Sequence, residues 1–359
     1  MMERVHSSMT KPASASPILI LLHIEKTAGM TTRGLFCRNV RDRGCVEIQG
    51  INDNSTHADW EQLLAQMRAI PLEQLAAWTA YHGNVRYGFH KVLPGPARYI
   101  TFLRDPLKRI VSRYQMLRRL KVIDDQHRID ISKPEWNLSM TPGFTRSFDN
   151  WQTRVLAGLD RELPFGGCRE EHFQAARENL DRHFDFVGLT ERLDISVLLL
   201  NRLYRWPWRF FIPHNVAPVS SPLHADLPDP VLDAIRELNQ YDYRLYAYAQ
   251  KRLEDAVGRA GLGLSIELRL FSTCNAIHRV LHYTRHAFKR KSRFGRRPHG
   301  AKYVEIRFFH AEPPVGARPD GHDLPSVGQL PIITSPSTST GTPVTVSGYL
   351  ETSATTQMK

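Results

Sequence analysis

The stretch of sequence that decides the fold reads Ile18-Leu19-Ile20-Leu21-Leu22-His23-Ile24-Glu25-Lys26-Thr27-Ala28-Gly29-Met30-Thr31-Thr32. Its first five residues are aliphatic, which is typical of a strand buried on both faces in a parallel sheet. Small residues and a hydroxyl pair follow directly, as in a turn that opens a helix. We therefore predict a strand, a loop and a helix that begin an α/β fold.

The loop after this strand has the character of an anion site. Its backbone N–H groups can surround an oxyanion, and a helix N-terminus adds the positive end of a dipole. Lys26 adds a mobile positive charge, but it precedes the single glycine, whereas G-x-x-x-x-G precedes the lysine of a nucleotide P-loop. The alternative is an ordinary strand-to-helix turn with a capping threonine. The predicted anion-binding residues are Lys26, Thr27, Ala28, Gly29, Met30, Thr31 and Thr32.

Short apolar runs and helical patterns alternate along the following 230 or so residues, which is typical of βα units. We predict two further strands, at 99–103 and 184–188. The helices are predicted near 31–40, 60–70, 72–81 and 106–120, from Thr190 onward, and as one long helix over 231–255. The predicted fold class is an open, P-loop-like parallel sheet with helices on both faces.

A second strand-to-helix turn supplies a second candidate anion site. Arg104 follows the strand at 99–103, Asp105 suits an N-cap, and Pro106 suits the first helical position. Ligands of open α/β sheets bind at this carboxyl end of the strands. Ser112 lies two helical turns further on, so a bound phosphate can bridge its hydroxyl and the guanidinium of Arg104. The alternative is that Arg104 pairs with a surface carboxylate.

Composition defines the class of protein. The chain has 359 residues, of which 42% are hydrophobic and 23% charged, as in globular proteins. We predict a disordered lead-in at 1–16, the α/β domain at 17–255, a basic and partly helical extension at 256–310, and a Ser/Thr/Pro-rich disordered tail at 311–359.

No apolar stretch is long enough for a membrane span or a signal peptide, so the expected location is cytoplasmic or peripheral to a membrane.

The net charge of +12 is concentrated in the extension, where 256–310 contains twelve Lys and Arg against two Asp and Glu. Its densest part, 285–297, fits three interpretations: a solvated extension, a face on anionic lipid, or a track for an acidic polysaccharide. Nucleic acid suits the charge, but no motif supports it.

Four cysteines, Cys37, Cys45, Cys168 and Cys274, form no C-x-x-C pair, which argues against a zinc site. The sequence leaves open whether two of these cysteines form a disulfide.

Taken in order, the motifs resemble the carbohydrate sulfotransferase family typified by heparan sulfate 2-O-sulfotransferase. The loop is similar to that family's His-x-x-Lys-Thr-x-x-Thr, and Arg-Asp-Pro-x(5)-Ser follows at 104–112. Downstream, the segments 150–154, 186–193 and 241–249 resemble its Asn-x-Gln-Thr-Arg stretch, its Val-Gly-x-Thr-Glu element and its closing helix. The resemblance covers about residues 17–255.

The resemblance implies a cofactor and the roles of several residues. The co-substrate is 3′-phosphoadenosine 5′-phosphosulfate (PAPS), with its phosphosulfate at Lys26–Thr32 and its 3′-phosphate at Arg104 and Ser112. Lys26 is the catalytic cation, and no metal is expected. Glu25 stands where the family has proline, which places a carboxylate beside the anion site.

The resemblance also implies a base. The segment Tyr81-His82-Gly83-Asn84-Val85 resembles the family's Tyr-His-Gly-His-Val element. His82 matches the histidine taken as catalytic base, Asn84 replaces the second histidine, and His90 is the fallback. A histidine titrates near neutrality and suits this work.

The predicted function is sulfuryl transfer to a hydroxyl, most readily of a carbohydrate and in particular of an acidic polysaccharide. Two alternatives stay open. One is a P-loop-type kinase, disfavoured because Gly-Lys-Ser/Thr and a clear Mg²⁺ carboxylate are missing. The other is a non-catalytic polyanion-binding protein on a degenerate nucleotide fold.

Overall fold

The computed structural model describes residues 16–40, 44–49, 55–119, 146–212, 229–289, 303–307 and 345–346. The strands are β1 (Ile18–Leu22), β2 (Cys45–Gln49), β3 (Ala80–Gly83), β4 (Ala97–Leu103), β5 (Phe184–Leu189), β6 (Tyr303–Arg307) and β7 (Thr345–Val346). The helices are α1 (Gly29–Asn39), α2 (His57–Ala69), α3 (Leu72–Ala76), η2 (Phe89–Val92), α4 (Pro106–Arg119), α6 (Trp151–Ala157), α7 (Glu170–His183), η4 (Thr190–Arg192), α8 (Leu193–Tyr204), α9 (Asp229–Leu238), α10 (Gln240–Ala260) and α11 (Leu262–Lys289).

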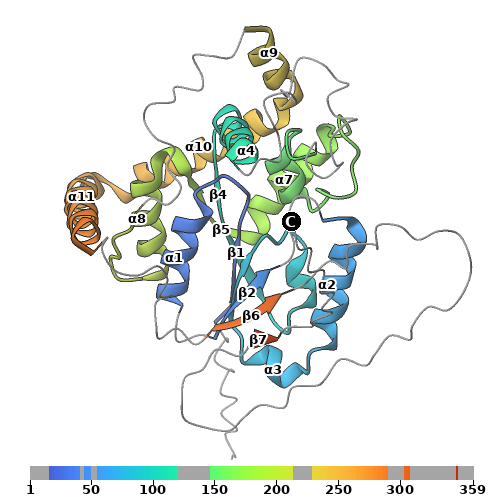
Figure 1. Ribbon diagram of the computed structural model, residues 1–359, viewed down its shortest axis with the longest axis horizontal. Coiled ribbons are helices and arrows are strands. Elements are labelled where there is room, and N and C mark those ends of the chain that lie inside the picture. Colours follow the sequence, from blue (N-terminus) through green and yellow to red (C-terminus); the bar gives the residue numbers. More distant parts are fainter. Residues whose placement is uncertain are drawn as a thin grey trace, which may run out of the picture.

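The strands form one sheet in the order β5-β4-β1-β3-β2-β6-β7, and every pairing in it is parallel. Figure 1 shows α1 and α8 on one side of this sheet and α2 on the other. The predicted fold class is therefore confirmed. β1 is buried along its whole length because it pairs with β3 and β4 and is covered on both faces.

This strand order positions the site. The chain leaves β1 toward β2, returns to β3 beside β1, and then continues into β4 on the other side of β1. The carboxyl ends of β1, β3 and β4 therefore lie side by side. They lead into His23, Asn84 and Arg104 respectively. A point where the strand order reverses is the usual ligand crevice of an open α/β sheet.

Local signals account for several element boundaries. Thr56 and Asp59 form a capping box at the start of α2. At α4 the Asp105 carboxylate accepts a hydrogen bond from the backbone N–H of Lys108 at 2.9 Å, as predicted for an N-cap.

Two predicted helices were wrong in part. The sequence 72–81 gives a helix only to Ala76, because 80–83 pairs with β1 and β2 as strand β3. The predicted single helix over 231–255 is two helices, α9 and α10, with Asn239 between them. The Asn239 side chain donates to the Phe148 carbonyl at 2.9 Å and accepts from the Asn150 N–H at 3.0 Å. It therefore ties the helix junction to another segment.

The extension at 256–310 is helical over α11 and also supplies β6, which pairs with β2. Residues 1–15, most of 285–297 and most of the tail at 311–359 lie outside the described ranges, so the predictions made for them stay predictions. None of the helices in the described ranges combines the length and apolar character that a membrane span requires.

Candidate active site at the carboxyl edge of the sheet

The loop between β1 and α1 is held in a tight, strained curve. Lys26 and Ala28 have φ values of 69° and 63°, in the left-handed region that L-residues with a side chain rarely adopt. The N–H groups of Thr31 and Thr32 both bond the Ala28 carbonyl, at 3.0 and 3.1 Å. A helix leaves its first N–H groups without intrahelical partners. The start of α1 at Gly29 therefore directs backbone donors into the loop, as an oxyanion site requires.

The threonine hydroxyl groups of the loop form hydrogen bonds to carbonyl groups of the same segment. The Thr27 hydroxyl donates to the Ile24 carbonyl at 2.7 Å, and the Thr32 hydroxyl lies 3.2 Å from the Gly29 carbonyl. Both threonines are buried, as is Thr31, whereas the Met30 side chain is 52% exposed. Because two hydroxyl protons are already committed, backbone N–H groups and Lys26 are the main donors that this loop offers to an anion.

Gly29 is required by the packing of His23. A Cβ atom on Gly29 would lie 1.7 Å from the Nε2 atom of His23. The imidazole therefore rests directly on the loop backbone at the first residue of α1.

We expect Gly29→Ala to displace the imidazole or the loop, since neither can accommodate the added carbon. Overpacking of this kind costs about 1–3 kcal/mol of stability. Denaturant unfolding and calorimetry with a nucleotide ligand should both show the loss. Gly34→Ala is the matched control on the same helix, because a Cβ there meets no atom within 4 Å. A Gly29→Ala protein as stable and as competent in binding as Gly34→Ala would contradict the packing argument.

Asn84 fixes the orientation of His23. The Nδ1 atom of His23 lies 2.7 Å from the Oδ1 atom of Asn84, across the ends of β1 and β3. Burial lowers the pKa of His23 below its ordinary value, so the ring is neutral at neutral pH. With Nδ1–H donating to the amide oxygen, the lone pair of the neutral ring is on Nε2, beside the loop. A neutral imidazole with an oriented lone pair is equipped to accept a proton.

Arg104 braces the loop from the end of β4. Its Nη1 atom donates to the Lys26 carbonyl at 3.0 Å, and its Nε atom lies 3.8 Å from the Glu191 carboxylate. The side-chain amide of Gln152 bonds both backbone groups of Arg104, each at 2.9 Å. The sequence-predicted pair of Lys26 and Arg104 is thus brought together.

The downstream motifs support this arginine. Asp242 is buried and accepts hydrogen bonds from the N–H groups of Gln152 and Thr153 at 3.1 and 2.8 Å. Glu191 accepts from the Tyr246 hydroxyl at 2.8 Å. Sequence reasoning marked these segments only through a resemblance. The signal it missed was physical: the buried Gln152 and Asp242 side chains must find partners, and Gln152 finds its partners in the backbone of Arg104.

The carboxylate of Glu25 is neutralised locally. It forms an ion pair of 2.8 Å with Arg113, whose side chain is only 3% exposed. The negative charge that the sequence places beside the anion loop is therefore balanced from α4. Ser112, the neighbour of Arg113, is half-buried on the same helix. Its predicted contact with a 3′-phosphate stays a prediction.

The Lys26 ammonium lies 3.6 Å from the Met116 sulfur on α4. The side chain is half-buried and extends from the loop toward that helix. A thioether is a weak acceptor, so this contact holds the ammonium much less strongly than an ion pair.

The predicted base His82 and its fallback His90 lie on β3 and in η2, and their catalytic role stays a prediction. His82 is 3% exposed on β3, its ring packs edge-on against Phe36 of α1, and it is hydrogen-bonded to the Cys37 thiol. His90 lies in η2, where its Nδ1 atom is 2.9 Å from the Tyr99 hydroxyl and its ring stacks on His183. His23, which the sequence marks only as a motif residue, is the histidine that packs on the loop at Gly29.

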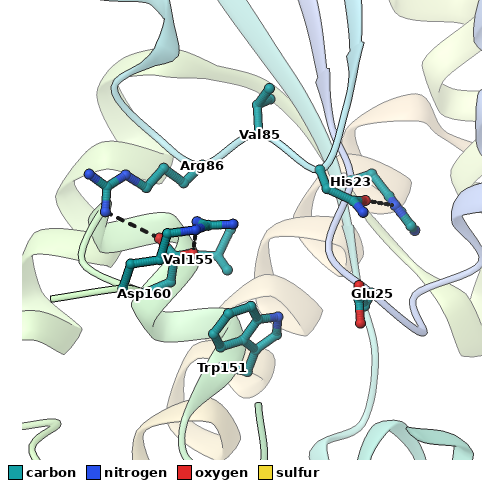
Figure 2. Close-up of a pocket in the computed structure, with 9 residues that line it drawn as sticks. His23, Glu25, Val85, Arg86, Trp151, Val155 and Asp160 are labelled. Atoms are coloured by element: carbon teal, nitrogen blue, oxygen red, sulfur yellow. Dashed lines mark hydrogen bonds and ion pairs between the residues drawn. The ribbon is translucent and has the colours of Figure 1, made fainter. Parts of the chain in front are cut away.

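A pocket opens beside the loop (Figure 2). His23 and Glu25 lie at one side of it, Arg86 and Asp160 at the other, and Trp151 borders it between them. The Arg86 guanidinium bonds Asp160 at 3.5 Å and Glu162 at 3.0 Å. The pocket thus combines a buried indole with compensated charges, and it has room for about one water molecule.

Comparisons with known proteins show the family of the chain. A family model described as the sulfotransferase family matches residues 16–249, which is more than half of the chain. Three similar relatives are heparan-sulfate 6-O-sulfotransferase 3 of Mus musculus, 6-O-sulfotransferase 1-A of Danio rerio and 6-O-sulfotransferase 3 of Homo sapiens. They are 25%, 25% and 24% identical to the chain over 280, 285 and 280 residues.

Each alignment covers 65% of this chain and 57%, 64% and 56% of the respective relative. The chain thus spans under two thirds of the length of these proteins. The motifs of the sequence resemble a family typified by the 2-O enzyme, whereas these relatives are named as 6-O enzymes. The family model covers the strands β1 to β5, the loop of Lys26 and the bracing Arg104, and the chain belongs to the sulfotransferase family.

Proposed function

We propose that the protein transfers a sulfuryl group from PAPS to a hydroxyl of a polysaccharide. The observation that carries the proposal is the meeting of three groups at one sheet edge: the strained loop with Lys26, the bracing Arg104, and a neutral His23 whose lone pair faces the loop. A kinase is disfavoured by the missing Gly-Lys-Ser/Thr signature. A purely polyanion-binding protein has no need of an oriented neutral histidine.

The proposed chemistry assigns one task to each group. The acceptor oxygen attacks sulfur while its proton passes to Nε2 of His23. The bond from sulfur to the bridging phosphate oxygen breaks, and Lys26 with the loop N–H groups stabilises the negative charge that develops on that oxygen. Binding of 3′-phosphoadenosine 5′-phosphate (PAP), measured by calorimetry, together with transfer of labelled sulfate from PAPS, tests the proposal. A protein that binds polysaccharide but not PAP would refute it.

The acceptor that we propose is a heparan-type polysaccharide, sulfated at a 6-O position, because the relatives carry that activity in their names. The charges at the far side of the pocket bordered by Trp151 are paired, so the pocket alone does not select a polyanion. The proposed track at 285–297 would supply that selectivity, and it lies almost wholly outside the described residues. Disaccharide analysis of the product separates 6-O from 2-O transfer.

For the cofactor, we propose that Arg104 reads the 3′-phosphate together with Ser112. Arg104→Ala should weaken PAP binding by about 1.5–3 kcal/mol, or about 10- to 100-fold, since a charge-assisted hydrogen bond is lost. Adenosine 5′-phosphosulfate, which lacks the 3′-phosphate, should lose much less affinity. Calorimetry with both nucleotides gives the comparison.

Arg98→Ala is the matched control for this experiment. Arg98 lies near the amino end of the same strand and pairs with Asp185, away from the loop. Equal losses for both nucleotides in Arg104→Ala would instead assign the arginine to bracing the loop at the Lys26 carbonyl.

A further inference from the structure

Three metal-ligating side chains meet beneath α1, outside the pocket described above. Cys37 comes from α1, Cys45 begins β2, and His82 lies in β3. Their ligand atoms all lie within 4.8 Å of one another. The sequence spacing conceals this cluster, because its members come from three different elements. The absence of a C-x-x-C pair therefore excluded only one kind of zinc site.

The geometry of the cluster matches a tetrahedral ion. The Sγ atoms of Cys37 and Cys45 are 3.9 Å apart. Two thiolates at the usual zinc–sulfur distance of about 2.3 Å and a tetrahedral angle are separated by about 3.8 Å. A disulfide needs about 2.05 Å between the sulfurs. The imidazole of His82 is hydrogen-bonded to the Cys37 thiol, so the nitrogen stands beside the sulfur pair.

The surroundings suit a structural metal. Cys45 and His82 are 2% and 3% exposed, and Phe36 packs on the imidazole. Two sulfurs and one imidazole nitrogen favour Zn²⁺ over the hard cations Mg²⁺ and Ca²⁺, which prefer oxygen. Glu47 follows Cys45 by two residues, so its side chain is on the same face of β2, and it pairs in register with His82. Its carboxylate, now bound to Arg33, or a water molecule can complete the coordination.

We propose that Cys37, Cys45 and His82 bind one Zn²⁺ ion that ties α1 to β2 and β3. Binding displaces the thiol protons to solvent. The ion would fix the helix whose first residue, Gly29, supports the anion loop. The proposal does not rest on sulfuryl transfer. It competes with His82 as the base, since a nitrogen that ligates a metal cannot accept the acceptor's proton.

The test uses the full chain, freed of metal with a chelator under reducing conditions and titrated with Co²⁺ and Zn²⁺. We expect one equivalent of Co²⁺ to give a thiolate-to-metal charge-transfer band, and Zn²⁺ to displace it. In Cys37→Ser and Cys45→Ser the band should fall to half or less, and Zn²⁺ affinity measured by chelator competition should fall at least 100-fold. Cys274→Ser, which alters a thiol on α11, is the matched control and should bind like wild type.

Several results would overturn the proposal. They are an absent charge-transfer band in the wild type, an unchanged band in both cysteine variants, or a Cys37–Cys45 disulfide in the protein isolated without reductant. The wild-type titration remains decisive even if a variant fails to fold. Zn²⁺ should also raise the melting temperature of the wild type and not of a folded Cys45→Ser protein. None of these measurements uses turnover, so a failed metal site is distinguishable from a failed sulfotransferase assignment.

A second inference concerns the outer face of α11, which Figure 1 shows at the edge of the molecule beyond α8. We call the large apolar side chains that are 53% to 90% exposed on this helix the α11 stripe: Leu262, Ile266, Leu270, Ile277, Val280, Leu281 and Tyr283. The inner face of the same helix is buried at Leu264, Phe271 and Asn275. Apolar residues on both faces of a helix indicate that the outer face has a partner.

Charge identifies the chemistry of that partner. No Asp or Glu occurs between Leu268 and Arg297. The same stretch contains Arg269, Arg279 and Arg285, followed by six arginines and lysines at positions 289 to 297. Apolar side chains flanked by basic ones on a helix are typical of binding to the plane of an anionic membrane. We propose that the α11 stripe docks on an anionic lipid surface, with Arg269 and Arg279 of the same helix at the headgroups.

Vesicle co-sedimentation of the full chain tests this. Binding is expected to vesicles that contain phosphatidylserine, to fall severalfold in pure phosphatidylcholine, and to weaken as salt rises. The double variant Ile277→Asp, Leu281→Asp should lose at least 10-fold in binding. Leu72→Asp, at a 67% exposed leucine on α3, is the matched control and should bind like wild type. Equal binding by the double variant, or a dimer that the double variant disrupts, would overturn the proposal.

Discussion

Replacement of Lys26 with alanine is expected to lower the rate of sulfuryl transfer about 10²–10³-fold, the usual cost of removing one preorganised electrostatic group. The physical reason is charge development, since the leaving phosphate oxygen becomes more negative as its bond to sulfur breaks. In the structure the ammonium lies at the loop, 3.6 Å from the Met116 sulfur, and we expect it to contact that oxygen when PAPS is bound. Single-turnover kinetics with PAPS give the measurement.

Lys91→Ala is a suitable control for charge alone, because Lys91 lies in η2, away from the loop. Its turnover should equal that of wild type. Near-normal turnover in the Lys26 variant would show that the reacting centre is not at the loop.

Replacement of His23 with alanine is expected to remove about 10²–10⁴-fold of the rate, the range typical of a general base. PAP affinity should change little, because the base acts on the acceptor. His82→Ala is the paired variant, since the resemblance assigns the base to His82. Both variants are compared in kcat and in calorimetric PAP binding. Loss of transfer in His82→Ala with normal transfer in His23→Ala would return the role to His82.

The pH profile separates a base from a packing residue. A base must be neutral to act, so kcat/KM is lost as the pH falls through its pKa. Burial lowers the pKa of His23 below the ordinary 6.5, so the acid limb should lie below pH 6.5 and the rate should be flat through neutrality. Asn84→Ala removes the partner that orients the ring and should lower kcat while leaving PAP binding intact. Rescue of His23→Ala by added imidazole would confirm the proton-transfer role.

The sequence predicted β1, its loop and the turn at Arg104 because their signals are local: a run of five aliphatic residues, and an Asp-Pro helix start. The sequence did not predict β2 and β3, because both strands are short. They also carry polar residues, Glu47 and His82, whose partners come from other elements. The role of His23 depends on contacts with Gly29 and Asn84, the second of them 61 positions away. No pattern along the chain encodes such a pairing.

The pairing of β6 with β2 limits how the basic extension can be studied. If the chain were cut after Asp255, the hydrogen-bonding groups along the outer edge of β2 would lose β6. An uncovered strand edge is a template for pairing between molecules, so the shortened protein would tend to aggregate. A loss of activity after truncation would then report insolubility rather than a missing polysaccharide track. Exchanging the basic residues for glutamine at constant chain length keeps the edge covered and isolates the effect of charge.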